Sequence, residues 1–509
     1  MIWLLAVLAF SYRALPRMLR KNAMPSDTYF HMFCAEAIRN NRFRIPRAIP
    51  RIVLCSRHTY PFLYHLLLAF FPIRLRVWAE RLTPAFFDTL MLLLVYAFVK
   101  WTAEGNPSIP VLVALLFAFS PALLRISLGP RVYSGSPRVP AEFFYMLHIL
   151  AFWIGFQSGN PLFWTISLLA GAALIITAKF ANQVFFFFGL WFTLIITPWY
   201  ALALLGSLAL SVLLTGGRAI DVLTGQIRHS IFYYKYSQRI FLHPNTPKVR
   251  PYISNLRSAF AALRRGHKVL STMRWFSMER FFLHQLVTVY PQFIFLAFVW
   301  PAAISSPVDR FLLVWSGAGL FWFFTTRIKS LMFLGEPDRY LEYALFPSLF
   351  LTVEYLVARN LAFIIYLFLL YSIVMVLFHL WLYLKTTDDN FETTNDLFTR
   401  LNGLEEGVIM PIGSFHWQTL YRSKFPVLTL ANADERLMPP EEFYLVYGNY
   451  PYPSARFQEI IERYNVRYVI SDKDHLAHYF NVILQEPERF TERTEKLFEA
   501  GSMLLFKVK

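Results

Sequence analysis

Residues 361–384 read LAFIIYLFLLYSIVMVLFHLWLYL, a run without lysine, arginine, aspartate or glutamate. A helix needs about twenty apolar residues to cross the hydrocarbon core of a bilayer, so this run is long enough to span a membrane. Ten further apolar segments precede it, near residues 1–11, 82–99, 109–124, 143–157, 161–178, 183–197, 200–215, 282–301, 311–326 and 341–357. We therefore predict an all-α polytopic membrane protein with about eleven transmembrane helices.

The composition also indicates a lipid environment. Of the 509 residues, 56% are hydrophobic and 16% are charged, and the mean hydropathy is +0.42. A soluble protein usually has about a quarter of its residues charged. The net charge of +17 would favour nucleic acid in a soluble protein. Here the charge lies in loops between apolar runs, so the predicted partners are the membrane, anionic headgroups or a phosphorylated lipid, and not nucleic acid.

The limits of the first apolar run and of the neighbouring segments 183–197 and 200–215 need interpretation. The first run is short for a span unless it continues, tilted, to Leu19 or the true start lies upstream, and it lacks the basic region and cleavage site of a signal peptide. Residues 183–197 and 200–215 together are too long for one span at 1.5 Å per residue. Pro198 lies between them, so we predict a hairpin of two spans.

The run YPFLYHLLLAFFP at residues 60–72 is short for a span and is predicted to be an interfacial helix. If it does not cross, span parity places the chemically capable segments on one face, namely the loops 12–81, 125–142, 216–281 and 327–340, Lys179 and the C-terminal residues. The positive-inside rule would make that face cytoplasmic, because residues 218–280 carry twelve lysines and arginines against two acids. The rule weakens for loops of about sixty residues, so charge alone does not decide the side.

The composition changes after Lys385, and residues 386–509 are more polar. Residues 386–396 (TTDDNFETTND) are predicted to form a linker. One run, SARFQEIIERYN at residues 454–465, has helical apolar spacing. Four runs read as short buried strands: GVIMPI (407–412), FPVLTL (425–430), VRYVIS (466–471) and MLLFKV (503–508). Residues 386–509 are therefore predicted to be a small soluble α/β domain following a transmembrane domain at residues 1–385.

Asp27 is the first candidate for chemistry. It precedes a predicted helix whose apolar stripe includes Phe30, Phe33 and Ile38. A carboxylate at this position would serve as an N-cap, and that structural interpretation is about as strong as the functional one. The functional interpretation is a general base at the membrane surface. The same helix carries Cys34, which forms either a disulfide with Cys55 or an unpaired thiol.

Two charged groups lie at the ends of apolar segments. Arg138 and Glu142 are spaced for an i,i+4 ion pair at a helix start, and Glu142 is otherwise a second acid for the same cavity as Asp27. Lys179 follows ALIITA, where it must reach either the headgroups or an anion. A lipid-linked phosphate is one such anion.

A second basic group precedes the segment 341–357. Arg327 lies shortly before the run GEPDRY, which contains Arg339 and Tyr340. The planar fork of Arg339 suits a phosphate, and its structural alternative is an interfacial anchor beside Tyr340.

Several motifs are absent from the sequence. There is no HExxH, Walker A loop, GxSxG or paired CxxC, and no DxD pair in residues 125–142. His475 and His478, near Asp474, have metal-ligand spacing but are usually surface residues in such a context. We predict no metal and no required cofactor; a divalent metal lacks the support of an acid pair.

Taken in order, these segments resemble the polyprenyl-phosphate-dependent integral membrane glycosyltransferases of the GT-C fold, which include protein O-mannosyltransferases and the aminoarabinose transferases of lipid A. The resemblance covers about the first 350 residues. Its motifs are SDTYFHMFCAEAIRNN (26–41), YPFLYHLLLAFF (60–71), FAFSPALLRISLGPRVYSGSPRVPAEFFYML (117–147), ALIITAKF (173–180) and GEPDRYLEYALFPSLFL (335–351).

The resemblance implies a catalytic base at Asp27 and a second acid at Glu142. It also implies that Lys179 and Arg339 lie near the donor phosphate, and we predict that Tyr340, Arg327, Arg239 and Arg57 contribute to the same site. Where the family often has Asp-Glu this chain has Asp27-Thr28, and where it often has Lys-Pro this chain has Tyr60-Pro61, with Arg57 as the nearby charge. The active face would be lumenal, periplasmic or extracellular, with the C-terminal domain on the same side.

The leading functional hypothesis is an inverting glycosyltransferase. It would move a sugar from polyprenyl phosphate to a hydroxyl of a lipid, glycan or protein acceptor. One alternative is a polysaccharide polymerase or ligase that uses a lipid diphosphate. The other is a transporter or flippase for lipid-linked sugars, although the internal repeats and midplane charges typical of transporters are not evident.

Overall fold

The computed structural model divides the chain into two compact units. The helical unit comprises residues 1–19, 80–220 and 243–387, and the mixed unit comprises residues 20–79, 221–242 and 388–509. The residues described are 1–20, 24, 26–103, 106–124, 133, 135–234, 249–264, 269–279, 281–299, 306–386, 391–413, 415–429, 439–449, 452–484 and 487–509. Residues 20–79, predicted as a loop of the transmembrane domain, thus share a unit with the C-terminal residues. The predicted boundary between a transmembrane domain at residues 1–385 and a soluble domain at residues 386–509 stays a prediction.

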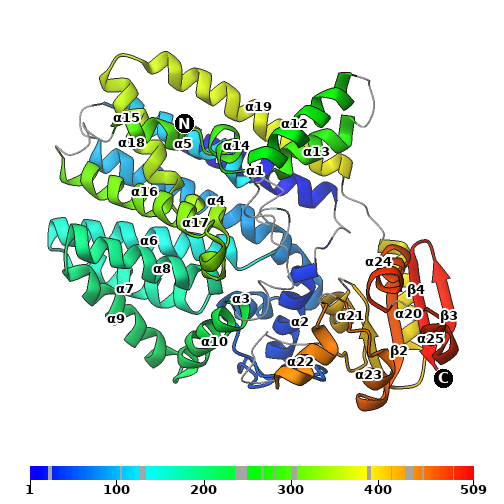
Figure 1. The fold of residues 1–509 in the computed structure, drawn as a ribbon. Helices are drawn as coiled ribbons and strands as arrows, with labels where there is room; N and C mark the ends of the chain where they lie inside the picture. The colour runs from blue at the N-terminus through cyan, green and yellow to red at the C-terminus, as the bar shows by residue number, and fades with distance from the viewer. Residues whose placement is uncertain are drawn as a thin grey trace. The chain divides into compact units, whose positions relative to one another are not determined.

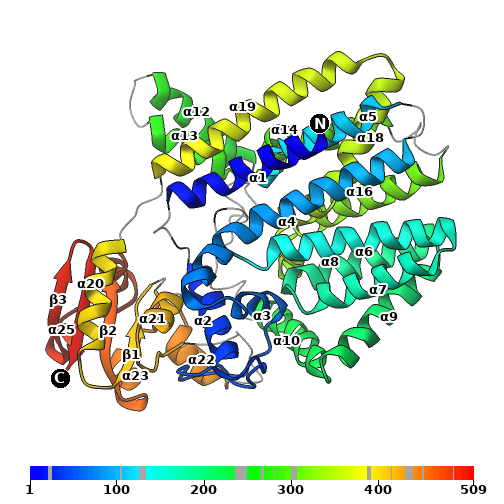
Figure 2. The same ribbon diagram turned by 180° about the vertical axis from the view of Figure 1, so that it is seen from behind.

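Apolar helices build the helical unit (Figures 1 and 2). Five described helices are long and apolar enough to cross a membrane, or up to seven if each of two bent helix pairs is one span. The five are α1 (Ile2–Leu19), α4 (Ile73–Thr102), α6 (Arg138–Ser158), α8 (Lys179–Trp191) with its π-helical continuation to Ile196, and α19 (Ala362–Thr386). The first run does continue to Leu19, as one of the predicted alternatives required. The count of eleven spans is not confirmed.

Several predicted spans form shorter or bent helices. The segment 282–301 was predicted as one span, but it contains α14 (Phe282–Thr288) and α15 (Gln292–Val299). The break includes Pro291, whose missing N–H interrupts the helical ladder. The helix break predicted at Pro198 is present, since α9 (Trp199–Leu214) begins directly after it, and the hairpin of two spans stays a prediction.

The remaining elements of the helical unit complete its packing. Helix α6 packs on α7, and α7 packs on α9; both views show the three side by side. Gly171 of α7 permits this approach, because a Cβ there would collide with Ser207 of α9. The bounds are α5 (Ser108–Ala118), α7 (Pro161–Ile175), α12 (Val249–Arg264), α13 (Val269–Met278), α16 (Pro307–Thr325), α17 (Pro337–Tyr343) and α18 (Leu345–Ala358), with α10 (Arg218–Phe232) passing into the mixed unit.

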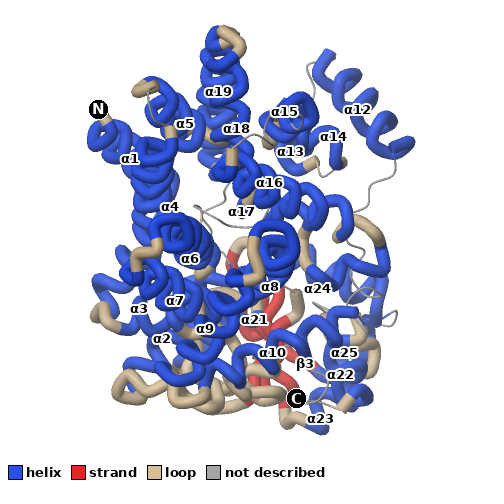
Figure 3. The backbone as a smooth tube through the Cα atoms, turned by 90° about the vertical axis from the view of Figure 1, so that its left-hand side faces the viewer, coloured by secondary structure: helices blue, strands red, loops and turns tan. Residues whose placement is uncertain are grey.

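A four-stranded sheet lies in the mixed unit, shown in red in Figure 3. Its order is β1-β2-β4-β3, with β1 parallel to β2 and the other pairs antiparallel. The strands are β1 (Val408–Pro411), β2 (Val466–Asp472), β3 (Thr494–Ala500) and β4 (Met503–Val508). The helices of the unit are α2 (Ser26–Asn40), α3 (Leu63–Ala69), α20 (Phe391–Asn402), α21 (His416–Arg422), α22 (Pro440–Tyr447), α23 (Phe457–Arg463), α24 (Lys473–His478) and α25 (Pro487–Arg493).

Two predictions for the C-terminal residues are wrong. The run FPVLTL is not a strand of the sheet, and its Val427 makes only isolated bridges to Ile52 and Ile409. The predicted linker 386–396 enters helix α20, because Leu397 and Leu401 place an apolar face against the sheet. Three predicted strands and the helix at α23 are confirmed.

The first loop contributes to the same core. Phe30 and Phe33 of α2 lie in a cluster with Leu420 of α21 and with Val427. Backbone bonds support this packing: the N–H of Val53 donates to the carbonyl of Val427 at 3.0 Å, and the N–H of Val427 donates to Arg51 at 2.8 Å. The mixed unit is therefore built from segments almost four hundred residues apart in the chain.

Candidate active site

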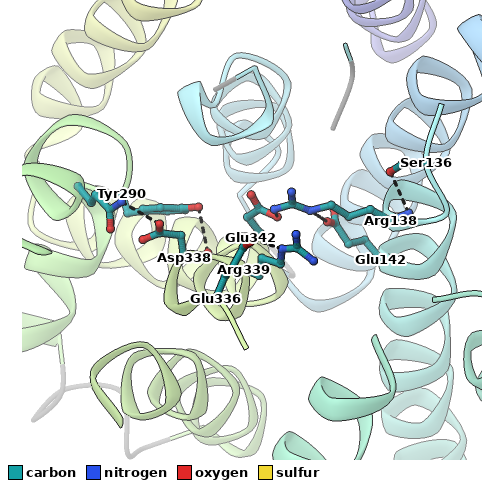
Figure 4. Close-up of polar contacts among 9 residues, drawn as sticks. Ser136, Arg138, Glu142, Tyr290, Glu336, Asp338, Arg339 and Glu342 are labelled. Carbon is teal, nitrogen blue, oxygen red and sulfur yellow. Dashed lines mark hydrogen bonds and ion pairs between the residues drawn. The ribbon is translucent and has the colours of Figure 1, made fainter. Parts of the chain in front are cut away.

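A buried ion cluster joins α6 to α17 in the helical unit (Figure 4). Arg138 is the first residue of α6, and its Nε lies 3.5 Å from Glu142 one turn on. The same guanidinium contacts Glu342 of α17. The three side chains are 9%, 5% and 1% exposed. Desolvated charges of this kind are costly unless paired, and the two carboxylates share Arg138 as a counter-charge here.

Asp338 is held at the start of the same short helix. Its carboxylate accepts hydrogen bonds from Gln285 Nε2 at 2.8 Å and from Arg327 at 3.2 Å. The Tyr290 hydroxyl donates to its backbone carbonyl at 3.2 Å, as Figure 4 shows. Arg327 also donates to Gln285. These contacts fix the first turn of α17, which carries Arg339.

Arg339 and Tyr340 contact the ring of Phe180, the residue that follows Lys179. Lys179 is the residue before Phe180 and begins α8. The guanidinium carbon of Arg339 lies 5.4 Å from the Phe180 ring centroid, and the Tyr340 ring centroid lies 4.9 Å from it. The start of α17, which carries Arg339, thus packs against the second residue of α8, the helix that Lys179 begins.

Gly335 makes this contact possible. Its φ of +122° lies in a region that residues with a side chain rarely adopt. A Cβ at this position would also lie 2.5 Å from Cε2 of Phe180. The glycine of the GEPDRY run therefore allows the segment before α17 to approach the start of α8.

The cations of this region differ in how accessible they are. Arg339 pairs with Glu336 at 2.9 Å, and its side chain is 29% exposed. Lys179 is half-buried. Arg327 is largely buried and stacks on the ring of Phe323. Tyr340 is fully buried, and its hydroxyl donates to the carbonyl of Leu334 at 2.6 Å.

Two predicted residues belong to the mixed unit. Asp27 is exposed and is the second residue of α2, which begins at Ser26. Asp27 is therefore not the N-cap, and its carboxylate lies in the first turn, where it complements the helix dipole. Arg57 is half-exposed and pairs with Asp221 at 3.1 Å. Arg239 lies outside the described residues.

The other candidates are not part of this cluster. His475 pairs with Asp472 at 2.8 Å, and this hydrogen bond raises the pKa of His475. The ring of His478 lies 4.8 Å from that of Tyr452. Cys34 and Cys55 are both buried and form no disulfide, so of the two alternatives the thiols are correct.

Sequence analysis missed Glu342, Asp338 and Gln285. Glu342 and Asp338 stand beside Arg339 in the quoted motif, and two acids in a segment that becomes buried are a signal that could have been used. Gln285 carries no such signal, because its partner is 53 residues away.

No protein-family profile and no curated protein matches the chain. Solved structures do. The archaeal oligosaccharyltransferase AglB from Archaeoglobus fulgidus, in complex with an inhibitory peptide and a dolichol-phosphate, matches with a TM-score of 0.57 and 12% identity, over 99% of this chain and 74% of that one. The arabinofuranosyltransferase AftD from mycobacteria matches with a TM-score of 0.50 and 13% identity, over 99% of this chain and 40% of that one.

These matches establish the fold class. The protein has the fold of GT-C membrane glycosyltransferases, as the resemblance predicted, and several of its helices are apolar enough for a multi-pass membrane protein. A further similar structure is ArnT from Cupriavidus metallidurans bound to undecaprenyl phosphate, with a TM-score of 0.48 and 13% identity, over 99% of this chain and 97% of that one.

Proposed function

We propose that the protein is an inverting glycosyltransferase that moves a sugar from a polyprenyl-phosphate donor to an acceptor hydroxyl. The observation that supports this proposal is the contact of Arg339 with the ring of Phe180, which brings α17 against the start of α8, the helix that Lys179 begins. Two cations at a pair of helix N-termini, in a membrane protein of this fold, suit the phosphate of a lipid carrier. The acceptor is a lipid, a glycan or a protein.

The proposed reaction has one displacement step. Asp27 accepts the proton of the acceptor hydroxyl while the oxygen of that hydroxyl attacks the anomeric carbon of the donor sugar. The bond from that carbon to the phosphate oxygen breaks, the electron pair leaves with the phosphate, and the configuration inverts. Lys179 and Arg339 stabilise the charge that develops on the leaving phosphate. Glu142 is the second acid.

The other predicted phosphate ligands contribute unequally. Arg327 already holds Asp338, so we assign it to positioning α17. Tyr340 supports the ring of Phe180 and can contact a phosphate only if its bond to Leu334 breaks. Arg57 and Arg239 remain proposed contributors from the loops.

The donor site predicts a specific loss of lipid binding. Replacing Arg339 with alanine should weaken the binding of undecaprenyl phosphate by roughly 10- to 100-fold, since a hydrogen bond to a charged group contributes about 1.5–3 kcal/mol. The dissociation constant is measured by microscale thermophoresis on the purified protein in detergent. Arg359→Ala is the matched control. Arg359 lies directly after the C-terminal end of α18, whereas Arg339 lies in α17, before the N-terminal end of α18. Equal affinities for the two variants would contradict the proposed site.

We also propose that the active face is extracytoplasmic. Span parity and the family resemblance support this side, and the basic loop opposes it. Ser254 of α12 and Ser502 of the β3–β4 turn are exposed. Ser254→Cys and Ser502→Cys should both react with a membrane-impermeant maleimide in intact cells. The parent protein, whose two cysteines are buried, gives the background. Labelling that appears only after lysis would place the face in the cytoplasm.

A further inference from the structure

Part of the mixed unit contains a buried group of histidine and thiol side chains that the proposed function does not use. Cys34, His58 and His65 offer ligand atoms that all lie within 4.8 Å of one another. All three residues are buried. His31 adjoins them: its Nδ1 lies 2.8 Å from Nε2 of His65.

Three separate pieces of backbone hold this group together. His31 and Cys34 are three residues apart on α2, so they share one face of the helix. His65 belongs to α3, which packs on α2. His58 lies between them in the chain, where its N–H donates to the carbonyl of Arg47 at 2.8 Å. The loop therefore folds back on itself to bring the group together.

One ring nitrogen of His65 is in an environment that suits the binding of a cation. Its Nε2 is engaged with His31, whereas its Nδ1 is buried and has no hydrogen-bond partner among the described residues. A buried polar atom without a partner is costly. If Nε2 carries the proton and donates it to His31, the lone pair of Nδ1 is available to a cation.

We propose that Cys34, His58 and His65 bind a transition-metal ion, for which Zn²⁺ is the best fit, and that His31 orients His65 by a hydrogen bond. One thiolate and two imidazoles suit Zn²⁺ and exclude Mg²⁺ or Ca²⁺, which require oxygen ligands. Ligand atoms around tetrahedral Zn²⁺ lie about 3.3–3.6 Å apart for bonds of about 2.0–2.3 Å, so the group draws together by roughly 1 Å on binding. The Cys34 thiol releases its proton to solvent, and a water fills the fourth position.

Such an ion would fasten α2, α3 and the segment between them. Apolar packing also joins α2 and α3, because Met32 and Leu68 belong to one buried cluster. Asp27 is on the same helix as two members of the group, so the ion would also fix the helix that carries the proposed base. Metal binding itself does not depend on the glycosyltransferase assignment, and it is tested by metal content and not by sugar transfer.

Metal content of the intact protein tests the proposal. The full-length chain, expressed with added Zn²⁺ and purified in detergent with its affinity tag removed, should contain about one equivalent of zinc by plasma mass spectrometry. Cys34→Ser and His65→Gln should lose it. Cys55→Ser, which alters the other buried cysteine, should keep it. Zinc retained in Cys34→Ser, or lost equally in Cys55→Ser, overturns the assignment.

A second arm does not depend on the variants folding. The wild-type protein is stripped with a chelator and reconstituted with Co²⁺, which should give a thiolate-to-cobalt charge-transfer band. Folded protein that takes up neither Co²⁺ nor Zn²⁺, or that binds Co²⁺ without this band, overturns the proposal.

His31→Phe should retain the ligands but weaken zinc affinity by about 10- to 100-fold, the usual cost of removing a residue that orients a histidine ligand. Unchanged affinity in His31→Phe would remove His31 from the site.

Discussion

Asp27→Asn should reduce sugar transfer by at least about a hundredfold while leaving the protein folded in the membrane. General-base catalysis contributes about 10²–10⁴-fold, and an amide cannot accept the proton of an acceptor hydroxyl. The loss of charge in the first turn of α2 should cost only about 0.3–1 kcal/mol of stability, because the position is exposed. The measurement is transfer from a polyprenyl-phosphate sugar by protein whose thermal unfolding has been checked.

The chain offers a matched control for that experiment. Asp474 is also exposed and is also the second residue of its helix, α24. Asp474→Asn therefore makes the same change to a helix dipole without touching the proposed base, and it should transfer sugar at the wild-type rate. Near-normal transfer by Asp27→Asn would remove Asp27 from the mechanism. Equal losses in both variants would assign the effect to helix stability.

The local features of the site could be predicted from the sequence, because they depend on short-range spacing. Arg138 and Glu142 are one helical turn apart, so their pairing follows from the helix alone. The third member, Glu342, is 204 residues from Arg138 and could not be assigned by spacing. The same limit applies to the group of Cys34, His58 and His65. A quarter of the twelve histidines and both cysteines fall within residues 31–65, a density that could have drawn attention to the metal-ligand residues there.

The fold was predictable where burial leaves a pattern. The apolar runs of the helical unit and the strands β2 and β4 were recognised because each contains a run of apolar residues that becomes buried. Strand β3 was missed because it is an edge strand with one buried residue and otherwise exposed or partly exposed side chains, so it lacks such a pattern. FPVLTL shows the converse error: its apolar side chains are buried against α2 and β1 instead of joining the sheet.

Arg138→Gln should strongly destabilise the helical unit. It would remove the arginine that Glu142 and Glu342 share, and breaking a buried pair from one side costs about 3–5 kcal/mol. Glu142→Gln should cost about 1 kcal/mol or less, because Arg138 and Glu342 then form a balanced pair. The midpoint of thermal unfolding in detergent ranks the variants.

The double variant Arg138→Gln/Glu342→Gln refines this argument. It removes the most buried carboxylate together with its partner, so it should be more stable than Arg138→Gln alone, and with Glu342→Gln measured as well it gives the coupling of the pair. If Glu142→Gln destabilises the protein as strongly as Arg138→Gln, Arg138 and Glu342 do not form a stable pair by themselves. If Glu142→Gln is stable yet transfers sugar at least about a hundredfold more slowly, Glu142 acts in the reaction as the second acid and its pairing with Arg138 is secondary. Stable protein with normal transfer would instead restrict Glu142 to holding the start of α6.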